Sequence, residues 1–290
     1  MSQIQNISSV SDQPILEVMV NGIPGKMGIS VAEAVLNRGL RLVPYSLCSE
    51  RCPLESFEIL GQKIQLIKPS QREQIISQIK NEHPQFISID YTHPSAVNSN
   101  GDFYSKNQLP FVLGTTGFDR EALFKTVREA GVSAVIAPNM GKQIVALQAM
   151  LDWAGTQFPG VFTGYNLHVE ETHQKAKSDT SGTAKAIVES FNRMGLPYEE
   201  SDIRLCRNDE EAVAHFKVPR AHVAGHAYHT YTITSEDGNV QFEIKHNVCG
   251  RSLYAEGSVD AAEFLFEKVS NKTKQNIYNM IDILQQGAMK

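Results

Sequence analysis

The chain has 290 residues, of which 41% are hydrophobic and 20% charged, and its formal net charge is −5. Because domains commonly hold about 100–150 residues, this length allows two of them, and the composition is that of a globular chain with a sizeable core. The acidic balance and the lack of Lys- and Arg-rich runs argue against a nucleic-acid partner. No apolar run reaches about 18 residues, so no membrane-spanning segment is expected.

Residues 1–13 are polar, with neither the apolar segment of a secretion signal nor an Arg-rich amphipathic pattern. We therefore expect a flexible N-terminus and a cytoplasmic protein, or one of the plastid stroma if a transit peptide has been removed. Cys48, Cys52, Cys206 and Cys249 have the spacing of neither a disulfide framework nor a zinc site. They are expected to be reduced thiols, and no metal is expected.

The first region alternates β-rich runs with helical patterns. The β-rich runs lie at residues 15–22, 40–47, 84–92, 109–117 and 132–141, and apolar residues at helical spacing follow most of them. Strands that alternate with helices imply right-handed crossovers and a parallel sheet covered on both faces. The pattern predicts a Rossmann-like, doubly wound α/β domain.

The second region has longer strands. After a helix over 141–158, strands are expected at 162–173, 226–235 and 239–248, and the last two are joined by a hairpin-like turn at Glu236, Asp237 and Gly238. This pattern predicts an α+β domain with an open mixed or antiparallel sheet. Residues 258–284 look helical and are expected to pack back on the first domain.

A glycine turn links the first expected strand to the first expected helix. A dinucleotide pyrophosphate needs backbone without Cβ atoms and the free N–H groups of a helix N-terminus. The spacing GxxGxxG departs from the usual GxGxxG, so a purely structural turn stays open as an alternative. The candidate cofactor-binding residues of this turn are Gly22, Ile23, Pro24, Gly25, Lys26, Met27 and Gly28.

Other strand ends add candidates for the same ligand. Beyond the second strand, Glu50 could accept from the 2′-hydroxyl of NADH, and Arg51 could bind the 2′-phosphate of NADPH, so both cofactors stay open. Lys26 could favour the phosphate or be an ordinary solvated lysine. In open α/β sheets ligands bind beyond the carboxyl ends of the strands, although these polar residues also form ordinary turns. The further candidates at such ends are Asp90, Thr92, Gly114, Thr115, Thr116, Pro138, Asn139 and Met140.

The stretch "HVEETHQKAKSDTSGTAKA" combines an imidazole, an ammonium and a Ser-Gly-Thr turn within residues 173–183. The turn opens an expected helix, so its N–H groups form a site for an anion such as a carboxylate. Lys177 adds a positive charge, and His173 could donate a proton near neutral pH, where its unperturbed pKa lies. A capped helix with a surface lysine and an incidental histidine is the alternative interpretation.

The chain resembles dihydrodipicolinate reductase, also called 4-hydroxy-tetrahydrodipicolinate reductase, of the diaminopimelate route to lysine. The stretches that carry the resemblance are "VNGIPGKMG", "DYTHP", "GTTGFD", "APNMGKQ", "HVEETHQKAKSDTSGTAKA" and "HNVCGRSLYAEGSVDAA". They run in the same order from about Pro14 to the C-terminus, and "MGKQ" and "HNVCGRSLYAEG" are more similar to the plant and chloroplast branch.

The resemblance implies a dinucleotide-binding domain at 14–142 and 253–290, a substrate-binding and oligomerisation domain at 143–252, and closure between them. NADPH or NADH would pass a hydride to a small cyclic dicarboxylate, and the protein would be a homo-oligomer, either a tetramer or a dimer. The implied proton donor is His173, and Lys177 would pair with a substrate carboxylate or a developing charge. The implied substrate-binding residues are Gln174, Ser181, Gly182 and Thr183.

One departure concerns the substrate site. Many bacterial members carry two adjacent histidines where this chain has His173 and Gln174, and the following segment is one residue shorter here. Gln can hydrogen-bond a carboxylate but carries no charge, so the role of His173 as an acid needs a test. His246 and Arg251 are expected to be a satisfied core histidine and a structural arginine.

Two other functions stay open from the sequence. One is a dinucleotide-sensing module without catalysis, and the other is a related dehydrogenase with another substrate. A semialdehyde dehydrogenase would need a cysteine nucleophile near the nicotinamide. None of the four cysteines falls in the strand-end turns at residues 90–94, 114–117 and 137–143, or in residues 173–183. Their positions therefore disfavour that reaction.

Overall fold

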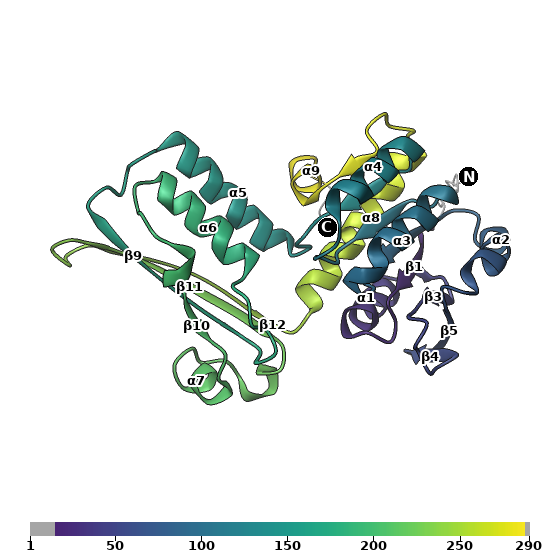
Figure 1. The fold of residues 1–290 in the computed structure, drawn as a ribbon, viewed down its shortest axis with the longest axis horizontal. Coiled ribbons are helices and arrows are strands. Elements are labelled where there is room, and N and C mark those ends of the chain that lie inside the picture. The colour runs from purple at the N-terminus through teal and green to yellow at the C-terminus, as the bar shows by residue number, and fades with distance from the viewer. Residues whose placement is uncertain (1–14, 288–290) are drawn as a thin grey trace, which may run out of the picture. The chain divides into compact units, whose positions relative to one another are not determined.

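The computed structural model describes residues 15–287, which form two compact units (Figure 1). Unit 1 holds the described residues up to Ala134 together with Ala262–Ile277, and unit 2 holds Val135–Ala261 together with the described residues from Tyr278 onward. The expected domain boundaries at 142/143 and 252/253 fall inside unit 2 and stay predictions. Within residues 15–287, no helix is both long and apolar enough to cross a membrane.

Unit 1 contains most of a six-stranded sheet with the order β13-β8-β7-β6-β1-β2. β1 pairs in parallel with both β2 and β6, and β6 pairs in parallel with β7. These central strands are almost wholly buried, as expected for a parallel sheet covered on both faces. The predicted Rossmann-like, doubly wound fold is confirmed. The strands are β1 (Glu17–Asn21), β2 (Arg41–Leu42), β6 (Phe86–Asp90), β7 (Phe111–Leu113), β8 (Ala134–Ile136) and β13 (Ile277–Tyr278).

Helices follow these strands and bury one apolar side each. In α4, for example, Leu123 and Val127 are buried, the Asp119 side chain caps the first turn, and Gly131 ends the helix in the left-handed conformation. α8 has residues in both units. The helices are α1 (Lys26–Asn37), α2 (Arg72–Glu82), α3 (Pro94–Lys106), α4 (Arg120–Ala130) and α8 (Ser252–Ser270).

The expected strand at 40–47 is two strands in the structure. Pro44 separates β2 from β3 (Tyr45–Leu47), because proline has no N–H to continue a ladder. β3 pairs instead with β5 (Gln62–Ile67), which forms a hairpin with β4 (Ser56–Ile59) in a separate three-stranded sheet. The sequence analysis missed this sheet, although Leu60 and Gly61 make a two-residue turn with positive φ at both positions.

Unit 2 is a mixed sheet covered by two helices. The strands, in the order β10-β9-β11-β12, are β9 (Tyr165–His173), β10 (Arg204–Cys206), β11 (His226–Ser235) and β12 (Gln241–Cys249). β9 and β10 are parallel, whereas β11 is antiparallel to both β9 and β12, which confirms the predicted open mixed sheet. Figure 1 shows α5 (Lys142–Gln157) and α6 (Gly182–Arg193) on the same side of this sheet.

The core of unit 2 lies between the sheet and these helices. Val169, Tyr231 and Ile233 of the strands pack with Ile187 and Phe191 of α6. Smaller elements complete the unit, namely the helix α7 (Asp209–Ala214) and the 3-10 helices η1 (Glu200–Asp202) and η2 (Arg220–His222). The core fixes the end of β9 and the start of α6, which carry the predicted substrate residues.

The expected helix over 258–284 is wrong in its extent. α8 begins earlier, at Ser252, and ends at Ser270, after which the chain forms β13 and then the short helix α9 (Met280–Gln285). Lys272 adopts a positive φ just after α8, and Asn279 starts a new helix through a capping box with Asp282. Turn and cap chemistry therefore interrupts a segment that composition alone would continue as one helix.

Candidate active site

The glycine turn of unit 1 has the geometry of an anion site. Gly22 has a φ of +100°, and a Cβ there would lie 2.5 Å from the backbone oxygen of Tyr91. A Cβ on Gly25 would lie 2.6 Å from the oxygen of Gly22, so neither position has room for a side chain. No side chain among the described residues caps α1 at Gly25, which leaves its first N–H groups for a ligand. The turn therefore fits a pyrophosphate.

A buried carboxylate organises the strand ends beside this turn. Asp90 is fully buried at the end of β6, and its Oδ1 accepts hydrogen bonds from the N–H and hydroxyl of Thr92, both at 2.7 Å. Its Oδ2 accepts from the Tyr104 hydroxyl at 2.6 Å and from Asn100 at 3.0 Å. Burial, together with Asp90, raises the pKa of Tyr104, so the hydroxyl stays a donor. All these partners of Asp90 are neutral.

Asn21 extends the same network, and the sequence analysis missed it. This fully buried side chain accepts from the N–H of Leu47 at 2.8 Å and donates to the Tyr104 hydroxyl at 3.0 Å. It thus joins the end of β1 to β3 and α3. A buried polar residue directly before the glycine turn was the available signal, because such groups are nearly always hydrogen-bonded.

Glu50 and Arg51 lie on the surface after β3, but they differ in their contacts. The two oxygens of Glu50 accept from the N–H and hydroxyl of Ser70, at 3.2 and 2.9 Å. The Arg51 side chain is exposed, and its guanidinium has no ion-pair partner within residues 15–287. The cation is therefore available to a ligand, whereas the carboxylate is already engaged.

The remaining cofactor candidates fall in both units. In unit 1 the Thr115 hydroxyl donates to the carbonyl of Thr92 at 2.9 Å, and a Cβ on Gly114 would lie 2.4 Å from the Tyr91 ring. The other candidates of unit 1 are half-buried or exposed, except for the buried Ile23 and Gly28; they are Pro24, Lys26, Met27 and Thr116. Unit 2 holds the exposed Pro138, the half-buried Asn139 and the buried Met140.

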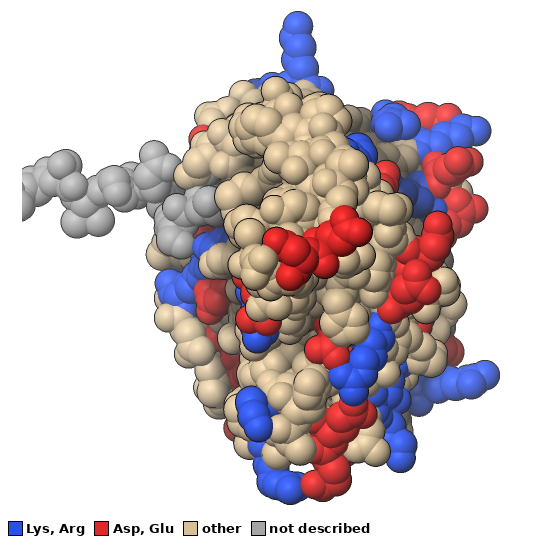
Figure 2. Space-filling model, turned by 90° about the vertical axis from the view of Figure 1, so that its left-hand side faces the viewer, with Lys and Arg blue, Asp and Glu red and all other residues tan. Residues whose placement is uncertain are grey.

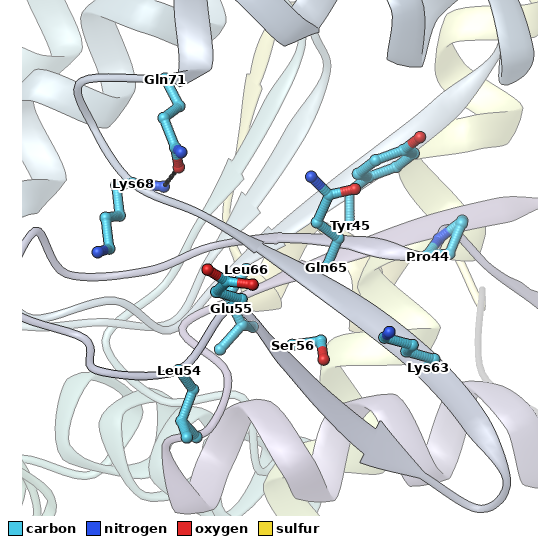
Figure 3. A pocket seen from close by; sticks show the side chains of 10 residues that line it. All are labelled: Pro44, Tyr45, Leu54, Glu55, Ser56, Lys63, Gln65, Leu66, Lys68 and Gln71. Carbon is cyan, nitrogen blue, oxygen red and sulfur yellow. Dashed lines mark hydrogen bonds between the residues drawn. The ribbon is translucent and has the colours of Figure 1, made fainter.

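A cavity of about 540 Å³ in unit 1 contains none of the predicted site residues. It lies against the three-stranded sheet, and Figure 3 shows Lys68 and Lys63 on opposite sides of it, with Glu55 and Ser56 between them. The N–H of Lys68 donates to the Gln71 side chain at 3.1 Å. Cavity size therefore does not identify the glycine turn as a candidate site. The turn is identified by its own backbone geometry.

A buried polar cluster lies at the end of β9 in unit 2. Glu171 and His173 are two residues apart and so share one face of the strand, and His229 of β11 lies directly opposite Glu171. The Nε2 atom of His229 is 3.3 Å from Glu171 Oε2 and 3.3 Å from His173 Nε2. His173 Nε2 lies 3.9 Å from the same carboxylate oxygen. The sequence motif predicted a role for His173 but gave no signal for its two partners.

Arg207 balances the charge of this cluster. The Glu171 side chain is fully buried, and Arg207 donates to its Oε1 at 2.5 Å. The N–H of Ser181 also donates to Glu171, at 3.2 Å to Oε2. Burial alone would raise the pKa of Glu171, but hydrogen bonds from His229 and Arg207 lower it to about 2. Because the guanidinium already neutralises the carboxylate, we assign these side chains to a hydrogen-bond network and no metal to them.

The environment of His173 differs from the sequence expectation. Burial, and then the neighbouring His229, Arg207 and Lys177, lower the pKa of His173 to about 3, against the opposing effect of Glu171. The imidazole is therefore neutral near neutral pH. The expectation rested on an unperturbed pKa, which a sequence cannot correct without knowing the burial of the ring.

The loop from Gln174 to Thr183 presents the other predicted substrate residues. The Lys177 ammonium pairs with Asp179 at 2.8 Å, an interaction that the sequence analysis did not foresee. The N–H of Thr183 donates to the Ser181 hydroxyl at 3.2 Å, and the N–H of Ser181 is used by Glu171. Gly182 is exposed at the start of α6, and Asn139 donates to the Thr183 hydroxyl at 3.4 Å. Gly182 and Thr183 thus keep groups that face solvent, with half-buried Gln174 at the start of the loop.

His246 lies behind the cluster, on β12. Its ring stacks on His229 with 4.4 Å between centroids, and its Nε2 is 3.4 Å from the Tyr231 hydroxyl. Burial, followed by the neighbouring His229, lowers the pKa of His246 to about 3. Its Nδ1 is buried without a partner among the described residues, so the ring is a core histidine that is only partly satisfied. Arg251 lies just before α8, and its guanidinium approaches Gly225.

Comparisons with known proteins agree on one family. The sequence model of the dihydrodipicolinate reductase N-terminus matches residues 16–140, and that of the C-terminus matches residues 144–284. The chain is 48% identical over 275 residues, which are 95% of this chain and 79% of the relative, to 4-hydroxy-tetrahydrodipicolinate reductase 1, chloroplastic, of Arabidopsis thaliana. Reductase 2 of the same plant is 46% identical, over 98% of this chain and 81% of the relative.

A solved structure supports the fold. Dipicolinate-bound dihydrodipicolinate reductase from Paenisporosarcina sp. TG-14 superposes with a TM-score of 0.61 at 18% identity, over 92% of this chain and 98% of that one. The two family models together match almost the whole described chain, and the plant relatives share close to half of its residues. The chain therefore belongs to the dihydrodipicolinate reductase family.

Proposed function

We propose that this chain uses NADPH or NADH to reduce 4-hydroxy-tetrahydrodipicolinate to tetrahydrodipicolinate on the diaminopimelate route to lysine. The observation that carries the proposal is the buried, charge-balanced cluster around His173 beside the N-terminus of α6. It occurs in a chain that is 48% identical to a plant reductase of that name. No observation favours a non-catalytic sensing module or another substrate.

We place the cofactor pyrophosphate at the glycine turn of unit 1. Gly22 and Gly25 leave no space for a Cβ, and no described side chain caps the start of α1, so backbone N–H groups can receive the negative charge. When bound, the cofactor supplies the hydride. In this proposal Asp90 shapes the neighbouring turn through Thr92 and makes no contact with the cofactor, because both of its oxygens are already engaged.

The surface after β3 supports NADPH as the preferred cofactor. Arg51 is exposed and available to a 2′-phosphate, and Lys26 is exposed in the glycine turn. Glu50 could accept from the 2′-hydroxyl of NADH only by giving up its hydrogen bonds to Ser70. NADH is then the weaker of the two ligands.

We place the dicarboxylate substrate at the loop before α6. One carboxylate binds at Gly182 and Thr183, where the helix N-terminus favours an anion. Lys177 reaches the other carboxylate by exchanging its partner Asp179, whose side chain is 74% exposed and so can turn to solvent. Gln174 adds a neutral hydrogen bond. The two negative charges of the ring favour a proton on His173, which it then donates to the substrate.

We also propose that the protein is a homo-oligomer assembled through unit 2. Large apolar side chains are more than half exposed on and after α5, namely Met150, Trp153, Phe158 and Val161, with Phe242 of β12 47% exposed. Figure 2 shows a broad surface without charged residues near the top of this end of unit 2. Large exposed apolar side chains on an uncharged surface are typical of protein interfaces, and a second copy is the expected partner.

The assembly has a direct test in light scattering after size-exclusion chromatography. Trp153→Asp should give a smaller species than the unaltered protein. Leu60→Asp, at an exposed apolar residue of unit 1, should not change the mass. Equal masses for the unaltered protein and Trp153→Asp would contradict this interface.

The location of the protein stays a prediction. The plant relatives named above are described as chloroplastic, and we expect this chain in the plastid stroma or in the cytoplasm. Imaging of a fluorescent fusion in the source cells would distinguish the two compartments.

The proposed reaction is tested by following the oxidation of NADPH in a coupled assay with dihydrodipicolinate synthase. Turnover should require the synthase product, and His173→Ala should lower kcat by about 10²–10⁴-fold, the usual contribution of general acid–base catalysis. Cofactor binding should persist in that variant, because His173 belongs to unit 2 and the glycine turn to unit 1. Absence of turnover with both cofactors would refute the proposal.

A further inference from the structure

The two ring nitrogens of His173 have different surroundings. Nε2 faces inward, where His229 and Glu171 lie within 3.3 and 3.9 Å. Nδ1 has no hydrogen bond among the described residues. It is nevertheless not one of the fully buried polar atoms that lack a partner, so part of this atom is accessible. Nδ1 is therefore the nitrogen that solvent reaches, although the ring as a whole is 8% exposed.

The tautomer of His229 follows from its own contacts. Its Nδ1 is buried without a partner among residues 15–287, whereas its Nε2 contacts both Glu171 and His173 at 3.3 Å. A buried N–H without an acceptor costs more than a buried lone pair without a donor, so the proton of His229 belongs on Nε2. From there it points to Glu171 Oε2, the oxygen that His173 Nε2 also faces at 3.9 Å.

We propose that Glu171 and His229 are positioning residues for His173. They hold Nε2 inward, so that protons enter and leave at Nδ1, and Glu171 supplies the negative charge that lets His173 become charged when a dianionic ring binds. The inference rests on the proposed function, because it takes the substrate to be such a ring. It assigns roles to two residues that touch neither substrate nor cofactor.

The charge balance around His173 explains why the carboxylate is needed. Arg207 and Lys177 place positive charge near the ring, and His229 lies against it, so only Glu171 favours the charged form. Behind His229, the neutral and buried His246 closes the cluster on the β12 side. A ligand with two carboxylates adds the remaining negative charge that makes protonation favourable.

The proton transfer then balances. His173 keeps Nε2–H in both its neutral and its charged form, and this N–H faces Glu171 Oε2, which lies 3.9 Å from His173 Nε2 and 3.3 Å from His229 Nε2. The Nδ1–H bond breaks toward the substrate, and its electron pair stays on Nδ1, which leaves a neutral ring. A proton from solvent restores the charge at Nδ1.

Proton uptake on ligand binding tests the inference without turnover. The probe is pyridine-2,6-dicarboxylate, a planar dianion, titrated calorimetrically into the protein with bound NADPH, between about pH 5 and 7, in buffers of different ionisation enthalpy. The unaltered protein should take up close to one proton per site, because His173 becomes charged. The Glu171→Gln variant should take up clearly less than one proton, because glutamine keeps the shape of the side chain but lacks its negative charge. Equal uptake by both proteins would overturn the inference.

Kinetics give a second readout that a merely structural role would not move. Glu171→Gln should lower kcat about 10- to 100-fold with little change in KM, and the falling limb of the kcat profile should move to lower pH by about one unit. His229→Gln, whose amide N–H can still donate to Glu171, should retain more activity than His229→Leu. An unshifted pH profile in Glu171→Gln would overturn the inference.

A matched control separates this role from loss of a buried histidine in general. His226 of β11 is 3% exposed and contacts the Thr172 hydroxyl at 3.0 Å, one residue before His173. His226→Gln should keep the proton uptake and the pH profile of the unaltered protein. NADPH binding by each variant reports that it is folded, and if Glu171→Gln fails this check, His229→Gln carries the test. If the unaltered protein takes up a proton but shows no turnover, the proposed function fails and the positioning role stands.

Discussion

The two units each bury one carboxylate at a strand end, and the partners of the two groups differ. Within the described part of the chain, Asp90 of β6 accepts only from neutral donors, namely the backbone and hydroxyl of Thr92, the Tyr104 hydroxyl and the Asn100 amide. Glu171 of β9 instead pairs with Arg207 and contacts His229, with His173 nearby. Around the first carboxylate lie hydroxyl, amide and backbone groups, whereas two imidazoles lie beside the second.

This difference separates a structural role from a chemical one. A carboxylate surrounded by neutral donors fixes the shape of a turn, and we expect its loss to appear as lower stability. A carboxylate beside imidazoles also sets their charge, so its loss should appear in a pH profile. The same burial, with different partners, thus supports the cofactor turn in unit 1 and proton transfer in unit 2.

The largest expected effect is the acid sensitivity of unit 2. The pKa of Glu171 is about 2 in the folded chain and near 4.5 when unfolded, so its stabilising contribution is present above about pH 4.5 and is lost as the pH falls toward 2. The shift corresponds to about 3 kcal/mol of unfolding free energy. His173 and His246, with pKa values lowered from 6.5 to about 3, act in the same direction, because the unfolded chain binds their protons first.

Hydrogen exchange followed by mass spectrometry at a series of pH values would resolve the two units. Peptides from β9 and β11 should lose protection at a higher pH than peptides from β1 and β6. Glu171→Gln should show a shallower dependence on pH, because it lacks the titrating carboxylate. Simultaneous loss of protection in both units would contradict the comparison.

A smaller effect is expected from Asp90→Asn. The Asn side chain would place an NH₂ donor against Thr92 or against Tyr104, which already donate there, and the lost hydrogen bonds should cost about 2 kcal/mol of unfolding free energy. Urea unfolding measures this loss, with Asp102→Asn as the control, since Asp102 is exposed on the same helix as Tyr104. The pH profile of kcat should keep its shape. Equal stability of the two variants would show that the network around Asp90 is not structural.

The sequence predicted the fold better than the chemistry of the site. The spacing of apolar residues and the turn residues between them were enough to predict the parallel sheet and the mixed sheet. A buried strand or helix face requires apolar residues at a fixed spacing, and that spacing is visible in the sequence. They fail where a short strand pairs locally, as in β4 and β5, or where a cap such as Asn279 restarts a helix. The motif identified His173 and Lys177, but Glu171, Arg207 and His229 come together only through strand register and tertiary packing. Their effect on the pKa of His173 could not be read from the chain.

The smallest expected effect is on NADPH binding, and it concerns a third carboxylate, the exposed Glu50, with the neighbouring cation Arg51. Because Glu50 is held by Ser70 at the surface and Arg51 is not paired within residues 15–287, Arg51→Ala should weaken NADPH binding about tenfold, the loss of one charge-assisted hydrogen bond. NADH binding and the free energy of unfolding should hardly change, because an exposed arginine adds little to stability. Fluorescence titration with both cofactors measures the ratio, and Lys63→Ala, at another exposed cation of unit 1, should leave it unaltered. A parallel loss for both cofactors would place Arg51 against the pyrophosphate or the ribose, and the preference for NADPH would then need another residue.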